Sequence, residues 1–256
     1  MLIAQISDTH ILTQESEHPA AELRADCLRQ CVADINRQAP DAVIFTGDTV
    51  QHGQPEEYAR LRELLAPLEV PLFPIPGNRD ASNEMRAAFG DLAFLAETDA
   101  FLHYVIEDYD VRLVGVDSTL AGERKGRFCE LRQAWLENTL GAQPDRPTLL
   151  FIHHPPFDVG EHYVGGYRRP EEAAALEDIV NRHSQVTGML CGHVHWPVNR
   201  DWAGTQARIM PSIAVDVRKG IDEEDAGGRP IYMLHRLSGV TGLVSHARTV
   251  EPEGGV

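Results

Sequence analysis

LIAQISDTH, residues 2–10, joins a short apolar run directly to two side chains that commonly bind metals, Asp8 and His10. Side chains two positions apart in an extended segment point the same way, so both face one side where the run ends. A single D-x-H triplet is common in proteins and fits a surface turn equally well. The stretch decides the fold because the same arrangement, an apolar run followed by ligand-type residues, recurs along the chain.

Later apolar runs also end at oxygen or imidazole side chains. They are AVIFTGD (42–48), PLFPIPGN (71–78), TLLFIH (148–153) and VTGMLCGHVH (186–195), which supply Asp48, Asn78, His153, His193 and His195. Residues so far apart in sequence meet only if the fold places these strand ends on one rim. Oxygen and imidazole ligands without thiolate suit a pair of hard-to-borderline divalent ions. Two ions that share a carboxylate are a device for phosphoryl hydrolysis, and Asp48, with its two oxygens, is the candidate for the shared ligand.

The front half of the chain predicts parallel βαβ units. Strands are expected at 2–7, 42–46 and 71–75, with helices at 20–38 and 56–65 between them. Open α/β sheets bind ligands at the carboxyl ends of their strands. We therefore expect Asp8, Asp48 and Asn78 at one edge of one sheet.

The second half is richer in strands. An antiparallel pair is expected at 101–107 and 111–116, further strands at 148–152, 186–191, 206–210, 231–236 and 242–248, and helices at 131–140, with Trp135 on the apolar face, and 171–183. Together the two halves predict an α/β fold of two packed mixed sheets with helices outside, in a single domain over residues 1–256. The Gly-rich, charged loops 156–170 and 217–230 are candidates for a substrate lid.

Composition narrows the classes of partner. The chain has 39 acidic and 23 basic side chains and a formal charge of -16, which argues against a protein that coats nucleic acid. It shows no apolar membrane-spanning run and no signal peptide, so no membrane partner and a cytoplasmic location are expected. We expect the four cysteines to be buried free thiols, although Cys27 and Cys31, one helical turn apart, leave a redox pair open.

The five clusters, taken in order, resemble the calcineurin-like metallophosphoesterase superfamily, whose pattern is D-x-H, G-D, G-N-H-[DE], H and G-H-x-H. The segments ISDTH, GDTVQHG, PEEY, PGNRD, HHPP and CGHVH are most similar to its class III cyclic-nucleotide phosphodiesterases and bacterial glycerophosphodiesterases. The resemblance implies a four-layer αββα sandwich and two metal ions, commonly iron, manganese, zinc or cobalt. It assigns one ion to Asp8, His10, Asp48 and His195, and the other to Asp48, Asn78, His153 and His193.

One departure from the pattern concerns Arg79, which stands where the family has a histidine. Guanidinium stays protonated and cannot act as a general acid, but it can hold a phosphoryl oxygen pair with two parallel hydrogen bonds. We predict that Arg79 stabilises transition-state charge and that water or another residue protonates the leaving group. The alternative is an ion pair between Arg79 and Asp80 or another carboxylate.

Other polar residues have weaker claims. His154 is assigned with Asp48 and Arg79 to the catalytic group, in the outer shell or against substrate, with a structural role as the alternative. His52 is a candidate for contact with a ligand. The set expected to recognise the non-reacting half of a diester comprises His162, Tyr163, Tyr167, Arg168 and Arg169, with Arg218 and Lys219 weaker still. The remaining histidines, at 18, 103, 183, 235 and 246, are expected at the surface or in packing.

The predicted activity is hydrolysis of a small phosphodiester, a glycerophosphodiester or a cyclic nucleotide, by attack of a metal-bridging hydroxide. Phosphomonoester hydrolysis on the same scaffold is an alternative, because Arg79 also suits a dianion. A nuclease is disfavoured by the acidic composition. A non-catalytic metal-binding scaffold is the alternative from another class, although no expected ligand type is missing. A homo-oligomer is left open.

Overall fold

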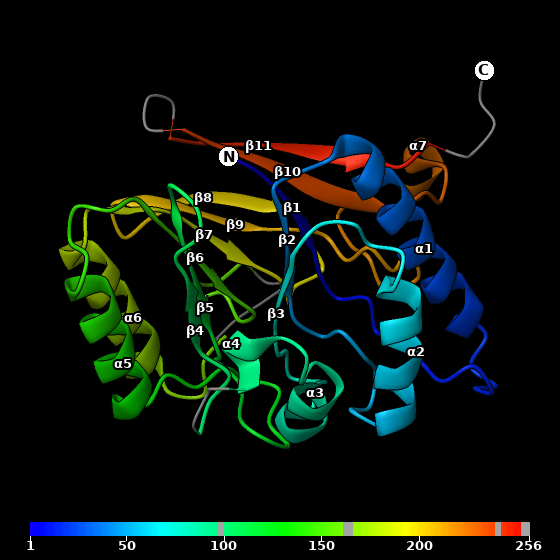
Figure 1. The fold of residues 1–256 in the computed structure, drawn as a ribbon, viewed down its shortest axis with the longest axis horizontal. Coiled ribbons are helices and arrows are strands. Elements are labelled where there is room, and N and C mark those ends of the chain that lie inside the picture. The colour runs from blue at the N-terminus through cyan, green and yellow to red at the C-terminus, as the bar shows by residue number, and fades with distance from the viewer. Residues whose placement is uncertain (97–99, 161–165, 239–241, 252–256) are drawn as a thin grey trace.

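The computed structural model describes residues 1–96, 100–160, 166–238 and 242–251. Its first sheet has the strand order β11-β10-β1-β2-β3. The strands are β1 (Leu2–Ile6), β2 (Ala42–Thr46), β3 (Leu72–Ile75), β10 (Ile231–Ser238) and β11 (Gly242–Thr249). β1, β2 and β3 are parallel, whereas β10 runs antiparallel to both β1 and β11. The crossover helices α1 (Ala21–Gln38) and α2 (Pro55–Leu65) lie on its outer side (Figure 1).

The second sheet has the order β4-β5-β6-β7-β9-β8. Its strands are β4 (Tyr104–Ile106), β5 (Arg112–Val116), β6 (Thr148–Ile152), β7 (Val186–Cys191), β8 (Val198–Trp202) and β9 (Thr205–Ile209). β5, β6, β7 and β9 are parallel, and β4 and β8 are antiparallel edge strands. Helices α5 (Glu130–Gly141) and α6 (Pro170–Arg182) cover its outer face (Figure 1). Short helices are α3 (Ser82–Ala88), α4 (Ala93–Ala96) and α7 (Glu223–Ala226).

Side-chain alternation in the second sheet explains how four layers hold together. Leu113 and Leu149 belong to the hydrophobic cluster that also contains residues of β1, β2 and α1. Their neighbours Val114 and Leu150 belong to the cluster shared with α5 and α6. Because successive strand residues point to opposite faces, a central strand buried on both sides reads as a continuous apolar run. The expected αββα sandwich of two mixed sheets flanked by helices is therefore confirmed.

Some elements differ from the predicted ones. The first strand ends at Ile6 rather than at residue 7, and the strand expected at 101–107 covers only Tyr104–Ile106. β8 was not expected, because its sequence VNRDW is polar and three of its five side chains are exposed. α7 lies within loop 217–230, and part of loop 156–170, residues 161–165, lies outside the described residues. Within the described chain, no helix combines the length and apolarity needed to cross a membrane.

Candidate metal centre

The strand ends of both sheets meet at one rim, where all seven expected ligands lie. Asp8, His10, Asp48 and His195 present ligand atoms within 4.8 Å of one another, and so do His153, His154 and His193. The side chain of His153 lies 3.3 Å from the amide oxygen of Asn78, measured from Nε2. The convergence follows from topology, because parallel strands deliver their carboxyl ends to a common edge.

The backbone at these residues adopts a rarely populated conformation. Five of the seven non-glycine residues with positive φ in the described chain are expected ligands: Asp8 (55°), His10 (48°), Asp48 (47°), His193 (72°) and His195 (60°). Asp and His tolerate the left-handed region better than most residues, but it still costs about 1–3 kcal/mol per residue. Strain gathered in this way is typical of a functional site.

Two motif glycines allow backbone segments to pack directly against ligands. A Cβ on Gly192 would lie 2.7 Å from a carboxylate oxygen of Asp8 and even closer to the hydroxyl of Ser7. A Cβ on Gly77 would collide with the backbone nitrogen of Asp48 and lie 2.8 Å from Cε1 of His153. Real Cβ atoms do not approach other atoms so closely, so these positions require glycine.

In the group formed by Asp8, His10, Asp48 and His195, hydrogen-bond acceptors face one another, an arrangement that a positive charge would stabilise. Nδ1 of His195 donates to the carbonyl of Val217 at 3.0 Å, so Nε2 of the neutral ring carries a lone pair. That lone pair faces Oδ1 of Asp8 at 3.2 Å and Nε2 of His10 at 3.1 Å. Two acceptors at this distance repel unless a proton or a metal ion lies between them. Nδ1 of His10 is buried with no hydrogen-bond partner among the described residues.

The second group repeats this pattern. Nδ1 of His153 donates to the carbonyl of Thr46 at 2.7 Å, so its Nε2 also carries a lone pair. Nε2 faces Oδ1 of Asp48 at 3.5 Å and lies 3.2 Å from Nδ1 of His193. The other carboxylate oxygen of Asp48, Oδ2, faces Nε2 of His10 at 3.8 Å. Asp48 thus presents one oxygen to each group, which is the geometry required of a bridging ligand.

Burial shapes the electrostatics of the centre. It raises the pKa of Asp48 to about 7, although His153 opposes the shift, and it lowers the pKa of His10 to about 3. Burial would raise the pKa of Asp8 as well, but the neighbouring imidazoles of His195, His153 and His10 together outweigh burial and lower that pKa. Burial also lowers the pKa of His193, whereas in His195 the neighbouring Asp8 overcomes burial and the pKa is raised. Imidazoles beside carboxylates that are shielded from water suit metal cations.

Asp80 is a supporting residue that residue-by-residue sequence reasoning missed. Its carboxylate accepts from the backbone nitrogens of Thr49 at 3.1 Å and Gly77 at 2.8 Å, and from the hydroxyl of Tyr58 at 3.0 Å. It therefore ties the loop after β2 to the loop after β3. The tyrosine belongs to the PEEY segment, one of those that resemble the phosphodiesterases of the superfamily.

Arg79 does not pair with Asp80, so that alternative is wrong. Its guanidinium forms no ion pair with any carboxylate in the described part of the chain, and it lines the cavity beside Asp48 and Asn78. Its backbone nitrogen donates to Oδ1 of Asp48 at 2.7 Å. A guanidinium without an ion pair next to the carboxylate of Asp48 is placed to contact an anion bound in the cavity.

His154 has a different environment from the one expected of a catalytic residue. The ring is fully buried, with Nδ1 2.8 Å from the hydroxyl of Ser118 and Nε2 3.2 Å from the carbonyl of Arg124. A carbonyl only accepts, so Nε2 carries the proton and Nδ1 accepts from the serine. With both nitrogens engaged, His154 holds the loop 118–127 in place, which favours the structural alternative.

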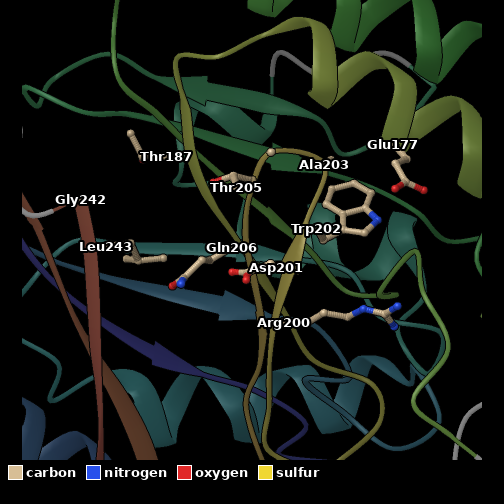
Figure 2. Close-up of a pocket in the computed structure, with 11 residues that line it drawn as sticks. Glu177, Thr187, Arg200, Asp201, Trp202, Ala203, Thr205, Gln206, Gly242 and Leu243 are labelled. Atoms are coloured by element: carbon tan, nitrogen blue, oxygen red, sulfur yellow. The ribbon is translucent and has the colours of Figure 1, made fainter.

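The cavity over the centre has a volume of about 300 Å³. Its lining residues are His10, Asp48, Asn78, Arg79, Arg124, Lys125, His193, Val194, His195 and Lys219. A larger cavity of about 690 Å³ lies elsewhere, where Glu177 of α6 faces Trp202 and the β8–β9 hairpin (Figure 2). None of the expected ligands lines that cavity, so we place the chemistry in the smaller one.

Several expected substrate contacts have other roles. His52 is exposed and pairs with Glu57 at 2.8 Å. Tyr167 is only 3% exposed, and Arg168 pairs with Glu123. Arg169 is the residue before α6, and Arg218 pairs with Glu223 and the carbonyl of Arg229. None of these five lines the cavity; His162 and Tyr163 lie outside the described residues. Of the weaker candidates only Lys219 lines it.

Comparison with known proteins agrees with this geometry. The family model for calcineurin-like phosphoesterases matches residues 1–197. A probable glycerophosphodiester phosphodiesterase of Arcobacter nitrofigilis is 34% identical over 255 residues, 96% of this chain and 92% of the relative. The 3′,5′-cyclic adenosine monophosphate phosphodiesterase of Escherichia coli K12 is 28% identical over 221 residues, 84% of this chain and 77% of the relative. A dimetal phosphatase from Danio rerio has a similar fold, with a TM-score of 0.72 at 14% identity, covering 98% of this chain and 99% of that one.

Proposed function

Because the chain belongs to the calcineurin-like phosphoesterase family, we propose that its strand-end residues hold two metal ions and hydrolyse small phosphodiesters there. The observation that carries the proposal is the position of Asp48, whose two carboxylate oxygens face the two separate groups of imidazoles. We assign one ion to Asp8, His10, Asp48 and His195, and the other to Asp48, Asn78, His153 and His193. The donor set fits iron, manganese, zinc or cobalt.

When bound, two such ions lower the pKa of water and withdraw charge from phosphoryl oxygens. The protein's own residues supply orientation. The carbonyls of Thr46 and Val217 fix the tautomers of His153 and His195, so that Nε2 of each ring is available to a metal. The guanidinium of Arg79 binds the phosphoryl group and stabilises the charge that develops on it. Because it does not release a proton, water or another group protonates the leaving alkoxide.

A diester is the favoured substrate class because the Arcobacter nitrofigilis and Escherichia coli relatives are named phosphodiesterases. Glycerophosphodiesters and cyclic nucleotides are both substrates named for such relatives, and both remain candidates for this chain. A cytoplasmic location and a homo-oligomer stay predictions.

The proposal is tested by metal content and by paired substrates. We expect about two ions per chain, loss of activity in chelator, and recovery with manganese or iron. The loaded protein should turn over bis(p-nitrophenyl) phosphate faster than p-nitrophenyl phosphate, whereas the reverse order would indicate a phosphomonoesterase. Asp48→Asn, which removes the shared charge but keeps the shape, should lose both metal binding and turnover. A protein that binds no metal and hydrolyses neither ester would contradict the proposal.

A further inference from the structure

Four basic side chains surround the mouth of the metal centre in a chain that is strongly acidic. Arg79, Arg124, Lys125 and Lys219 all line the cavity of about 300 Å³. The whole sequence contains two lysines, Lys125 and Lys219, and both are at this cavity. They come from loops 94 residues apart, so the fold, rather than a local basic run, brings them together.

None of the four forms an ion pair with a carboxylate in the part of the chain that the structure describes. Many arginines elsewhere do form such pairs, as shown by Arg24 with Asp216 at 2.7 Å and Arg127 with Glu172 at 3.0 Å. In a protein with 39 acidic side chains, cations without a counter-charge on one concave wall create a local field that attracts anions.

The loops that carry these side chains are held to the metal centre by their backbones. The nitrogen of Lys219 donates to the carbonyl of His195 at 3.0 Å. The carbonyl of Arg124 accepts from the ring of His154 at 3.2 Å. Next to Lys125, the nitrogen of Gly126 donates to the carbonyl of Gly166 at 2.9 Å. The cations are therefore carried on fixed backbone, whereas their long side chains can adjust to a ligand.

One phosphodiester does not need all four cations. Two divalent ions would already balance the combined charge of Asp8, Asp48, the attacking hydroxide and a phosphodiester monoanion, and Arg79 lies beside Asp48 at the reacting group. Arg124, Lys125 and Lys219 are therefore available to contact the non-reacting part of the substrate. Lysine suits this place because its ammonium is a compact charge on a flexible stem, which binds phosphate without the planar geometry that arginine imposes.

We propose that Arg124, Lys125 and Lys219 form an anion subsite that binds a second phosphate carried by the non-reacting half of the diester. The inference rests on the proposed function and narrows it, because it favours diesters with a further negative charge over those with a neutral or cationic head group.

The test uses two chromogenic diesters that differ in one group, thymidine 5′-(4-nitrophenyl phosphate) and its 3′-phosphorylated derivative. We expect metal-loaded wild type to prefer the phosphorylated diester in kcat/KM by about tenfold or more at low salt, and less so near about 0.5 M salt, where the Debye length shrinks below about 5 Å. Lys125→Gln and Lys219→Gln should each reduce the preference about three- to tenfold, and the double variant should nearly abolish it.

Controls separate the subsite from general charge effects. Arg236→Gln removes an exposed positive charge from β10 opposite Leu2, at the end of the sheet away from Asp8, and should leave the preference intact. Lys125→Arg should retain most of it. Calorimetry with thymidine 3′,5′-bisphosphate and thymidine 5′-monophosphate should give the same order of affinities without turnover.

The outcomes are distinct. Equal kcat/KM for the two diesters in wild type, or equal loss on both substrates in the lysine variants, would overturn the subsite. Binding of the bisphosphate that is unchanged in the double variant would do the same. Failure of metal-loaded wild type to hydrolyse either diester would instead contradict the proposed function.

Discussion

Replacing Gln5 with methionine is expected to destabilise the fold and to weaken metal binding, because Gln5 supports the strands that carry the expected ligands. Gln5 lies on β1 and is fully buried between the sheets. Its Nε2 donates to the hydroxyl of Thr46 at 2.9 Å and to the carbonyl of Cys191 at 3.1 Å, and its Oε1 accepts from Nε2 of His235 at 2.9 Å. The residue thus links β1, β2, β7 and β10, three of which lead into Asp8, Asp48 and His193.

The magnitude follows from the groups that lose a partner. Methionine is close to glutamine in size, so no large cavity forms. The ring N–H of His235 would remain buried without a partner, at about 1–3 kcal/mol, whereas the carbonyl of Cys191 still accepts from the backbone nitrogen of Met210 at 3.2 Å. The hydroxyl of Thr46 still reaches the carbonyl of Ile6 at 3.5 Å and adds little. Allowing for the greater apolarity of methionine, we expect a net loss of about 1–3 kcal/mol.

Urea unfolding of the metal-free protein measures this loss, and a double variant tests its cause. His235→Leu removes the N–H that Gln5→Met would strand, so the double variant should be at least about 1 kcal/mol more stable than additivity predicts. Manganese binding should also weaken in Gln5→Met. A single variant within about 0.5 kcal/mol of wild type, or strict additivity, would refute the idea that Gln5 stabilises the fold through these hydrogen bonds.

Three further predictions concern the centre and the core. Arg79→Gln should lower kcat about 100-fold, because it removes the charge that stabilises the transition state. Arg79→His should add an ionisation to the pH–rate profile. A histidine variant with neither a new ionisation nor a changed rate would rule out the charge-stabilising role of Arg79. Gly192→Ala should abolish stoichiometric metal binding measured by elemental analysis, because the added Cβ meets Ser7 and Asp8. Burial holds the pKa of His235 at about 3, below its value in the unfolded chain. Between about pH 6.5 and 3 the unfolded chain therefore binds a proton that the folded chain does not, so the free energy of unfolding decreases as the pH falls. His235→Leu should remove about 1.4 kcal/mol per pH unit of that slope in acid unfolding, and an unchanged slope would mean that the histidine is protonated in the fold.

The sheet framework and the positions of the ligands could be predicted because both depend on strong local signals. Continuous apolar runs bounded by Gly, Pro and polar residues indicated β1, β2 and β3, and the parallel connection through helices then fixed which ends share an edge. Asp8, Asp48 and Asn78 consequently lie together as expected. β8 gave no such signal, because an edge strand that pairs on one side needs no apolar pattern.

The supporting residues were harder to predict because their roles depend on tertiary contacts. Asp80 and Tyr58 meet only after two loops fold against each other, and nothing in their spacing indicates it. Lys125 lies in a loop whose position over the centre depends on the buried ring of His154. The scarcity of lysine was a usable signal, because the sequence contains two lysines and both line the cavity over the centre.

The residue types at the rim satisfy two requirements at once. Asp8, Asp48, His10, His193 and His195 adopt positive φ, a region in which Asp and His are enriched over most other side chains. The same side chains supply the oxygen and imidazole donors that the site needs. Asp and His therefore meet both requirements at these tight turns. The strain of the turns, together with lone pairs that face one another, opposes folding of the chain without metal. A cation relieves the second of these costs, so metal binding and the final geometry of the rim are expected to be coupled.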